Sequence, residues 1–122
     1  MKIRSYKDLE VWKKSIDIVT KIYKVTNSFP KDEIYSLVSQ LRRSAVSIPS
    51  NIAEGWGRNK TKEYIQFLRI ARGSLLELET QLIISNNLSY LNKQNMDNFL
   101  IKIKEINKML NALINILNKK VE

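Results

Sequence analysis

The sequence of 122 residues contains neither cysteine nor histidine. Without cysteine, disulfides, thiolate zinc sites and thiol nucleophiles are excluded. Without histidine, the chain lacks the usual general base and the commonest metal ligand. No nucleophile–base pair, phosphate-binding loop or metal cluster can be assembled from the remaining residues. We therefore expect a protein that is not an enzyme, with no catalytic residue, no cofactor and no bound metal.

Glycine and proline are also scarce, with three and two residues respectively. Such a chain has too few turn residues for a β-sandwich or β-barrel. No apolar stretch approaches the roughly 18 residues that a membrane-spanning helix needs. No apolar stretch follows the charged residues 1–7 either, so we expect no signal peptide, no membrane association and a cytoplasmic location.

Negative charge is in short supply, because 12 acidic residues face 21 lysines and arginines, giving a net charge of +9. The lysine excess lies in the first and last quarters of the chain, whereas most arginines lie between residues 42 and 72. Arginine suits phosphate better than lysine does, because its planar guanidinium group can donate two parallel hydrogen bonds. A basic chain of this kind is typical of nucleic-acid binding, although charge can also serve only solubility and steering.

Apolar residues recur at steps of three and four along four segments, which predicts helices over residues 7–27, 32–56, 61–88 and 93–119. The third and fourth segments show the alternation of a heptad. Long helices joined by short loops pack most simply as an up-down-up-down bundle. We therefore predict an all-α four-helix bundle that forms a single domain over residues 1–122.

The first predicted helix carries two apolar rows. The row predicted to face the core consists of Leu9, Trp12, Ile16, Val19 and Tyr23. The second row consists of Val11, Ile18, Ile22 and Val25. This excess, repeated in the third and fourth segments, favours an apolar surface that another subunit covers. The alternative is a broad core face with scattered exposed isoleucines.

Polar and small residues gather around Pro49 in the second predicted helix. A proline removes one backbone donor, so we expect one helix that is kinked at this residue. Ser47 and Asn51 can satisfy carbonyls that the kink frees, which is the structural interpretation. The functional alternative is that the kink shapes a surface carrying arginines. Gly55 is predicted to help end the helix.

Gly73 lies inside the third predicted helix, where glycine costs about 1 kcal/mol relative to alanine. A contact with another helix of the bundle is the favoured explanation, ahead of a ligand site. Glu54 and Glu77 are interpreted as ion-pair partners of arginines such as Arg42 or Arg58, within or between subunits.

Residues 40–58 read QLRRSAVSIPSNIAEGWGR. This block resembles that of the 23S rRNA intervening-sequence four-helix-bundle proteins, and the block ARGSLLELE at residues 71–79 resembles a second family block. The resemblance marks seven residues as family-motif positions with a structural role: Ser47, Pro49, Asn51, Glu54, Gly55, Gly73 and Glu77. It also implies an all-α bundle without enzymatic activity that assembles as a homo-oligomer, specifically a pentamer with a central pore.

A related branch comprises the accessory variability proteins of diversity-generating retroelements, which bind nucleic acid and a reverse transcriptase. Our first hypothesis is accordingly an oligomer that binds rRNA or another nucleic acid through phosphate contacts. The candidate residues are Arg42, Arg43, Arg58, Lys60, Lys62 and Arg69. The alternative is a protein-interaction scaffold, such as a reverse-transcriptase accessory ring, that does not itself bind nucleic acid.

Overall fold

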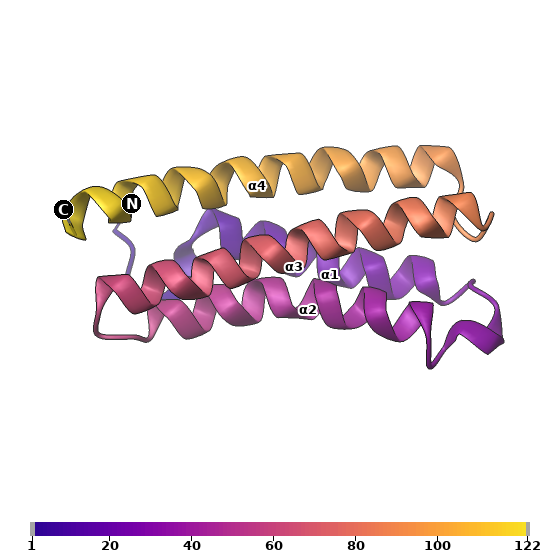
Figure 1. The fold of residues 1–122 in the computed structure, drawn as a ribbon, viewed down its shortest axis with the longest axis horizontal. Coiled ribbons are helices and arrows are strands. Elements are labelled where there is room, and N and C mark those ends of the chain that lie inside the picture. The colour runs from indigo at the N-terminus through magenta and orange to yellow at the C-terminus, as the bar shows by residue number, and fades with distance from the viewer. Residues whose placement is uncertain (1, 122) are drawn as a thin grey trace.

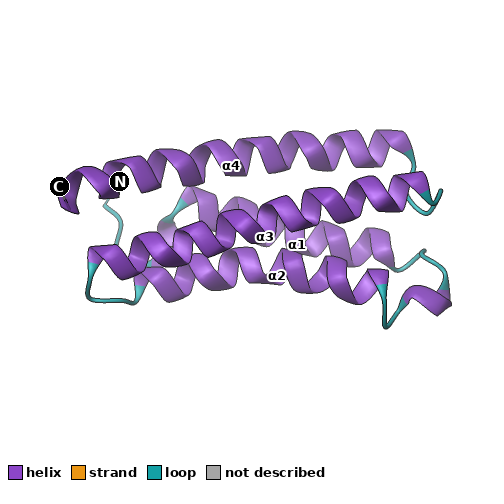
Figure 2. Ribbon diagram, in the orientation of Figure 1, coloured by secondary structure: helices purple, strands orange, loops and turns teal. Residues whose placement is uncertain are grey.

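The structure is a computed structural model that describes residues 2–121. Four long helices lie alongside one another, and both ends of the chain lie at the same end of the bundle (Figure 1). The described residues contain helices and loops but no strand (Figure 2). The elements are η1 (Tyr6–Asp8), α1 (Glu10–Thr26), η2 (Lys31–Glu33), α2 (Leu37–Trp56), α3 (Thr61–Asn87) and α4 (Lys93–Val121). The predicted all-α four-helix bundle is confirmed.

One hydrophobic core runs the length of the bundle and receives side chains from all four helices. The heptad of α3 is confirmed, because Leu68, Leu75 and Leu82 are fully buried. The heptad of α4 is confirmed as well, with Ile106 and Leu110 almost completely buried. No helix within residues 2–121 combines the length and the apolar character needed to cross a membrane.

The first helix begins later than the predicted residue 7. The Ser5 side chain accepts a hydrogen bond from the Lys7 backbone, and the Asp8 carboxylate accepts one from the Ser5 backbone. This capping box belongs to the short η1, not to the long helix. Leu9 then adopts an extended conformation, so α1 starts at Glu10. A three-residue turn thus carries the capping residues that precede α1.

The predicted core face of α1 is wrong in part, because Leu9, Trp12 and Val19 are partly buried against the core but the other two residues are not. Ile16 and Tyr23 are 39% and 42% exposed. The buried row consists of Val11, Ser15, Ile18, Ile22 and Thr26. The two hydroxyl residues can lie inside because each donates a hydrogen bond to a carbonyl of its own helix, Ser15 to Val11 and Thr26 to Ile22. Polar residues that interrupt the second row in the sequence therefore face the core.

The second helix begins at Leu37 instead of residue 32. Residues 31–33 form η2, where the Tyr90 hydroxyl donates a 2.9 Å hydrogen bond to the Glu33 carboxylate. Ile34, which the predicted helix would have included, is 49% exposed in the turn before α2. The helix ends at Trp56 as predicted and runs unbroken through Pro49, which confirms one helix there; the kink itself stays a prediction.

The last two helices agree with prediction to within two residues. α3 ends one residue earlier than predicted, and α4 continues two residues further. Asn92 caps α4, because its side-chain oxygen accepts a 2.7 Å hydrogen bond from the Asn95 backbone.

Candidate nucleic-acid interface

A polar cluster joins α2 to α3 at the middle of the bundle. The Ser47 and Ser74 hydroxyl oxygens lie 2.8 Å apart. The Asn51 amide donates to the Ser47 hydroxyl at 2.9 Å and to the Ser47 carbonyl at 2.7 Å. Pro49 deprives a different carbonyl, that of Ala45, of its donor. Ser47 therefore links α2 to α3, and Asn51 bonds to Ser47 within α2. The expectation that these side chains satisfy the carbonyl freed by the proline is wrong, because neither bonds to that of Ala45.

At Gly55, α2 and α3 approach each other closely. A Cβ atom at this position would lie 2.9 Å from both Phe67 Cβ and Tyr64 Cδ1. The prediction that Gly55 helps to end the helix is wrong, because the helix continues through it to Trp56. Gly57 follows the helix end as its C-cap. The first glycine is therefore needed for packing between helices.

Tyr64, opposite Gly55, carries a buried hydroxyl that has no hydrogen-bond partner among the described residues. Burial raises its pKa to about 12, because a buried phenolate would lose its hydration. Its ring meets that of Trp56 edge to face, with centroids 6.3 Å apart. Trp56 is therefore partly buried against α3.

Arg42 is bound to the end of α1. Its Nε donates to the Thr26 hydroxyl at 3.0 Å, and its Nη2 donates to the Asn27 side chain at 3.1 Å. The guanidinium group also lies 4.5 Å from the Tyr23 ring centroid. A cation near a helix C-terminus stabilises the helix, because the helix dipole is negative at that end. These contacts tie α2 to α1, whereas the adjacent Arg43 is exposed.

Arg58 is engaged by carboxylates at the turn between α2 and α3. It lies 3.1 Å from Glu54 and 3.9 Å from Glu63. Its guanidinium group also stacks 4.8 Å from the Phe67 ring centroid. The predicted pairing of Glu54 with an arginine is confirmed. Glu77 has no basic side chain within 4.0 Å among residues 2–121, so its pairing within the chain is not found.

The remaining candidates gather at one end of the bundle. Lys60, Lys62 and Arg69 are exposed, and within residues 2–121 no carboxylate lies within 4.0 Å of them. The C-terminal turn of α4, which carries Lys119 and Lys120, lies at the same end (Figure 1). A groove of about 380 Å³ between these helices is lined by Lys62, Ile65, Gln66, Arg69, Asn118 and Val121. We call the five cations Lys60, Lys62, Arg69, Lys119 and Lys120 the basic end.

The six predicted residues thus do not form one patch. Arg42 lies in the first half of α2, whereas Arg58 follows the end of that helix at Trp56, which is roughly 21 Å further along the helix axis. Sequence reasoning missed Lys119 and Lys120 as members of the interface. The up-down topology was the available signal, because it brings the end of α4 beside the start of α3.

Gly73 faces away from the bundle. It is exposed, and a Cβ atom there would meet nothing within 4 Å. The predicted contact with another helix of the same bundle is therefore wrong. Leu76 and Ile84, 51% and 42% exposed, lie on the same side of α3. A shallow depression there is lined by Gln40, Gly73, Leu76, Glu77, Thr80, Gln81 and Ile84. We call Gly73, Leu76, Thr80 and Ile84 the Gly73 face.

The fold and the α2–α3 contacts define an all-α four-helix-bundle protein in which two motif residues, Ser47 and Gly55, pack α2 against α3. The chain belongs to the family described as "23S rRNA-intervening sequence protein", which it matches over residues 7–112. It is also similar to the crystal structure of a protein of unknown function from the S23 ribosomal protein family of Bacteroides thetaiotaomicron VPI-5482. The two share 26% sequence identity with a TM-score of 0.77, over 85% of this chain and 97% of that one. Among curated proteins, none matches the chain.

Proposed function

We propose that this chain is a non-enzymatic, homo-oligomeric protein whose basic end binds the phosphates of rRNA or another nucleic acid. The observation that carries the proposal is the gathering of exposed cations from two elements without a neutralising carboxylate within residues 2–121. Surface cations in this state are free to replace the counterions of a phosphate backbone. A cytoplasmic location, where rRNA is found, fits this partner.

The chemistry of the basic end indicates how such binding would behave. Lysines dominate, and lysine acts as a point charge without preference for a base. Binding through phosphate contacts is strongly salt-dependent and weakly sequence-selective. Arg42 and Arg58 contribute less in this proposal, because each already has partners within the chain.

The Gly73 face supports self-assembly. An exposed glycine in the middle of a helix costs stability and has no local use here. Small residues beside exposed apolar ones allow a second backbone to approach closely. We propose that a second copy covers this face, and that the assembly is the pentamer implied by the resemblance.

The same face favours a second candidate function. A ring assembled through it could hold a protein, such as a reverse transcriptase, in the manner of the retroelement accessory branch. In that case the basic end would serve only solubility and steering. Nucleic-acid binding therefore discriminates between the two candidates.

The test is binding of structured 23S rRNA fragments and duplex DNA across a salt series. The variant combines Lys60→Ala, Lys62→Ala and Arg69→Ala, and the control removes the same charge elsewhere through Lys31→Ala, Lys104→Ala and Lys108→Ala. We expect the variant to reduce the slope of log K against log salt for the duplex by roughly 3, at about 0.9 per phosphate contact. Equal effects of variant and control, or no binding at low salt by an intact oligomer, would favour the scaffold.

A further inference from the structure

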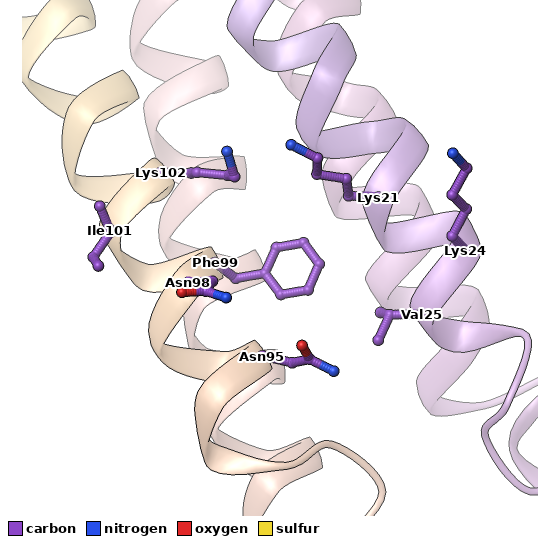
Figure 3. A pocket seen from close by; sticks show the side chains of 8 residues that line it. All are labelled: Lys21, Lys24, Val25, Asn95, Asn98, Phe99, Ile101 and Lys102. Carbon is purple, nitrogen blue, oxygen red and sulfur yellow. The ribbon is translucent and has the colours of Figure 1, made fainter.

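A groove opens between α1 and α4, at the opposite end of the bundle from the basic end. Its volume is about 620 Å³, within the range of small-molecule sites. The groove is lined by Lys21, Lys24, Val25, Asn95, Asn98, Phe99, Ile101 and Lys102 (Figure 3). Three cations, two amides and a small apolar floor therefore line one opening.

The cations of the groove are incompletely neutralised. Lys21 from α1 and Lys102 from α4 point toward each other across the opening (Figure 3). Both share one carboxylate, Asp17, at 2.8 Å and 3.8 Å. The nearby Lys21 lowers the pKa of Lys102, because two like charges disfavour each other. Lys24 has no carboxylate within 4.0 Å among residues 2–121.

A second carboxylate, that of Glu105, lies near the opening. It forms an ion pair with Lys14 at 3.1 Å and also acts to raise the pKa of Lys102, against the stronger lowering by Lys21. The ammonium groups of Lys21, Lys24 and Lys102 still outnumber the carboxylates of Asp17 and Glu105 beside them. An anion placed between Lys21 and Lys102 would relieve their repulsion and gain charge-assisted hydrogen bonds.

The remaining lining narrows the kind of anion. The Phe99 ring projects from α4 toward Val25 of α1 and forms a small apolar floor (Figure 3). The exposed Asn95 and Asn98 side chains make no hydrogen bond within the described residues. Each amide offers both a donor and an acceptor, as the edge of a nucleobase requires.

We propose that this groove binds a single nucleotide unit, with its phosphate between the lysines, its base against the Val25–Phe99 floor and the base edge at the asparagine amides. The unit can be a free mononucleotide or one unpaired nucleotide of a strand, since both present the same chemistry. The site is separate from the basic end, so either proposal can fail without the other.

The test uses the full chain, followed by NMR while adenosine and uridine monophosphates, inorganic phosphate or a short single-stranded RNA is added. We expect the nucleotides to shift the Asn95 and Asn98 side-chain signals and to bind more tightly than phosphate. Lys102→Ala should weaken binding about tenfold, whereas the matched Lys104→Ala should leave it unchanged. Equal melting temperatures would show that both variants fold.

The titration with mononucleotides distinguishes a free nucleotide from an unpaired nucleotide of a strand. Saturable binding of the monophosphates supports a free nucleotide, and binding of the RNA strand alone supports an unpaired nucleotide. Phosphate binding as tightly as the nucleotides, or equal losses in Lys102→Ala and Lys104→Ala, would overturn the proposal. The triple variant Lys60→Ala, Lys62→Ala, Arg69→Ala should still bind at the groove, which separates this test from that of the basic end.

Discussion

Two glycines of this chain have opposite surroundings, although both lie inside helices. Gly55 faces Tyr64 and Phe67 across a close contact between α2 and α3, and Gly73 faces open space. The same substitution should therefore have opposite effects on the free energy of unfolding at the two positions.

Gly55→Ala should destabilise the bundle by about 1–3 kcal/mol, because the added methyl group forces α2 and α3 apart. Denaturant unfolding measures the effect. The control is Gly57→Ala, where the nearest atom is 3.6 Å from the added Cβ and the glycine φ of −76° suits any residue. Equal stability of Gly55→Ala and the wild type would contradict the packing described here.

Gly73→Ala should stabilise the dissociated chain by about 1 kcal/mol, since alanine is the better helix former and meets no neighbour. If a second copy covers the Gly73 face, the same change should weaken self-association. Unfolding at low protein concentration measures the first effect, and analytical ultracentrifugation measures the second. Unchanged association of both Gly73→Ala and Leu76→Asp would exclude this face as the interface.

At the scale of elements, prediction from the sequence succeeded where one apolar row followed an uninterrupted heptad. The heptads of α3 and α4 correctly identified the residues that face the core, and the ends of these heptads gave the helix boundaries to within two residues. In α1, two apolar rows were present, and the sequence did not show which one is buried. The buried row includes Ser15 and Thr26, whose hydroxyls can lie in the core because they donate hydrogen bonds to carbonyls of their own helix. The starts of α1 and α2 were predicted too early, because residues 6–8 and 31–33 form short 3-10 turns instead of the first turns of these helices.

The candidate site was less predictable than the helices. Neighbours in sequence, such as Arg42 and Arg43, have different surroundings, because only one of them reaches the end of α1. The groove between α1 and α4 depends on how far two helices separate, and helical periodicity does not specify that distance. Lys21 and Lys102 are far apart in the chain, and only the packing of α1 beside α4 brings them together.

A tyrosine contact links two loops at one end of the bundle, and it predicts a loss of stability at alkaline pH. The Tyr90 hydroxyl donates to Glu33, and this bond raises the pKa of Tyr90. Burial raises the pKa of Tyr64 to about 12. A phenol whose pKa is higher in the folded state contributes stability that is complete below its unfolded pKa of about 10 and is lost as pH rises through the folded value.

We therefore expect the free energy of unfolding to fall as pH rises from about 10 to 12, while tyrosinate absorbance of the folded protein lags behind that of the unfolded chain. Tyr64→Phe and Tyr90→Phe should each remove part of this dependence. At neutral pH, Tyr64→Phe should also stabilise the protein by about 1 kcal/mol, because it removes a buried hydroxyl without a partner. Identical alkaline profiles for both variants and the wild type would show that these phenols do not control it.

At the scale of the whole molecule, the up-down topology determines how the charge is distributed. It places the start of α3 beside the end of α4, so cations from two distant parts of the sequence form the basic end (Figure 1). It places the Gly73 face along the outside of α3. The assembly and the nucleic-acid binding that we propose would therefore use different surfaces of one bundle.

The most direct test of phosphate binding at the basic end is to crosslink the intact protein to a bound 23S rRNA fragment and map the modified residues by mass spectrometry. We predict that crosslinks concentrate at Lys60, Lys62, Lys119 and Lys120, and that they disappear at high salt as phosphate contacts do. Crosslinks spread evenly over the exposed lysines, including Lys31 and Lys108, or none at low salt, would contradict the account.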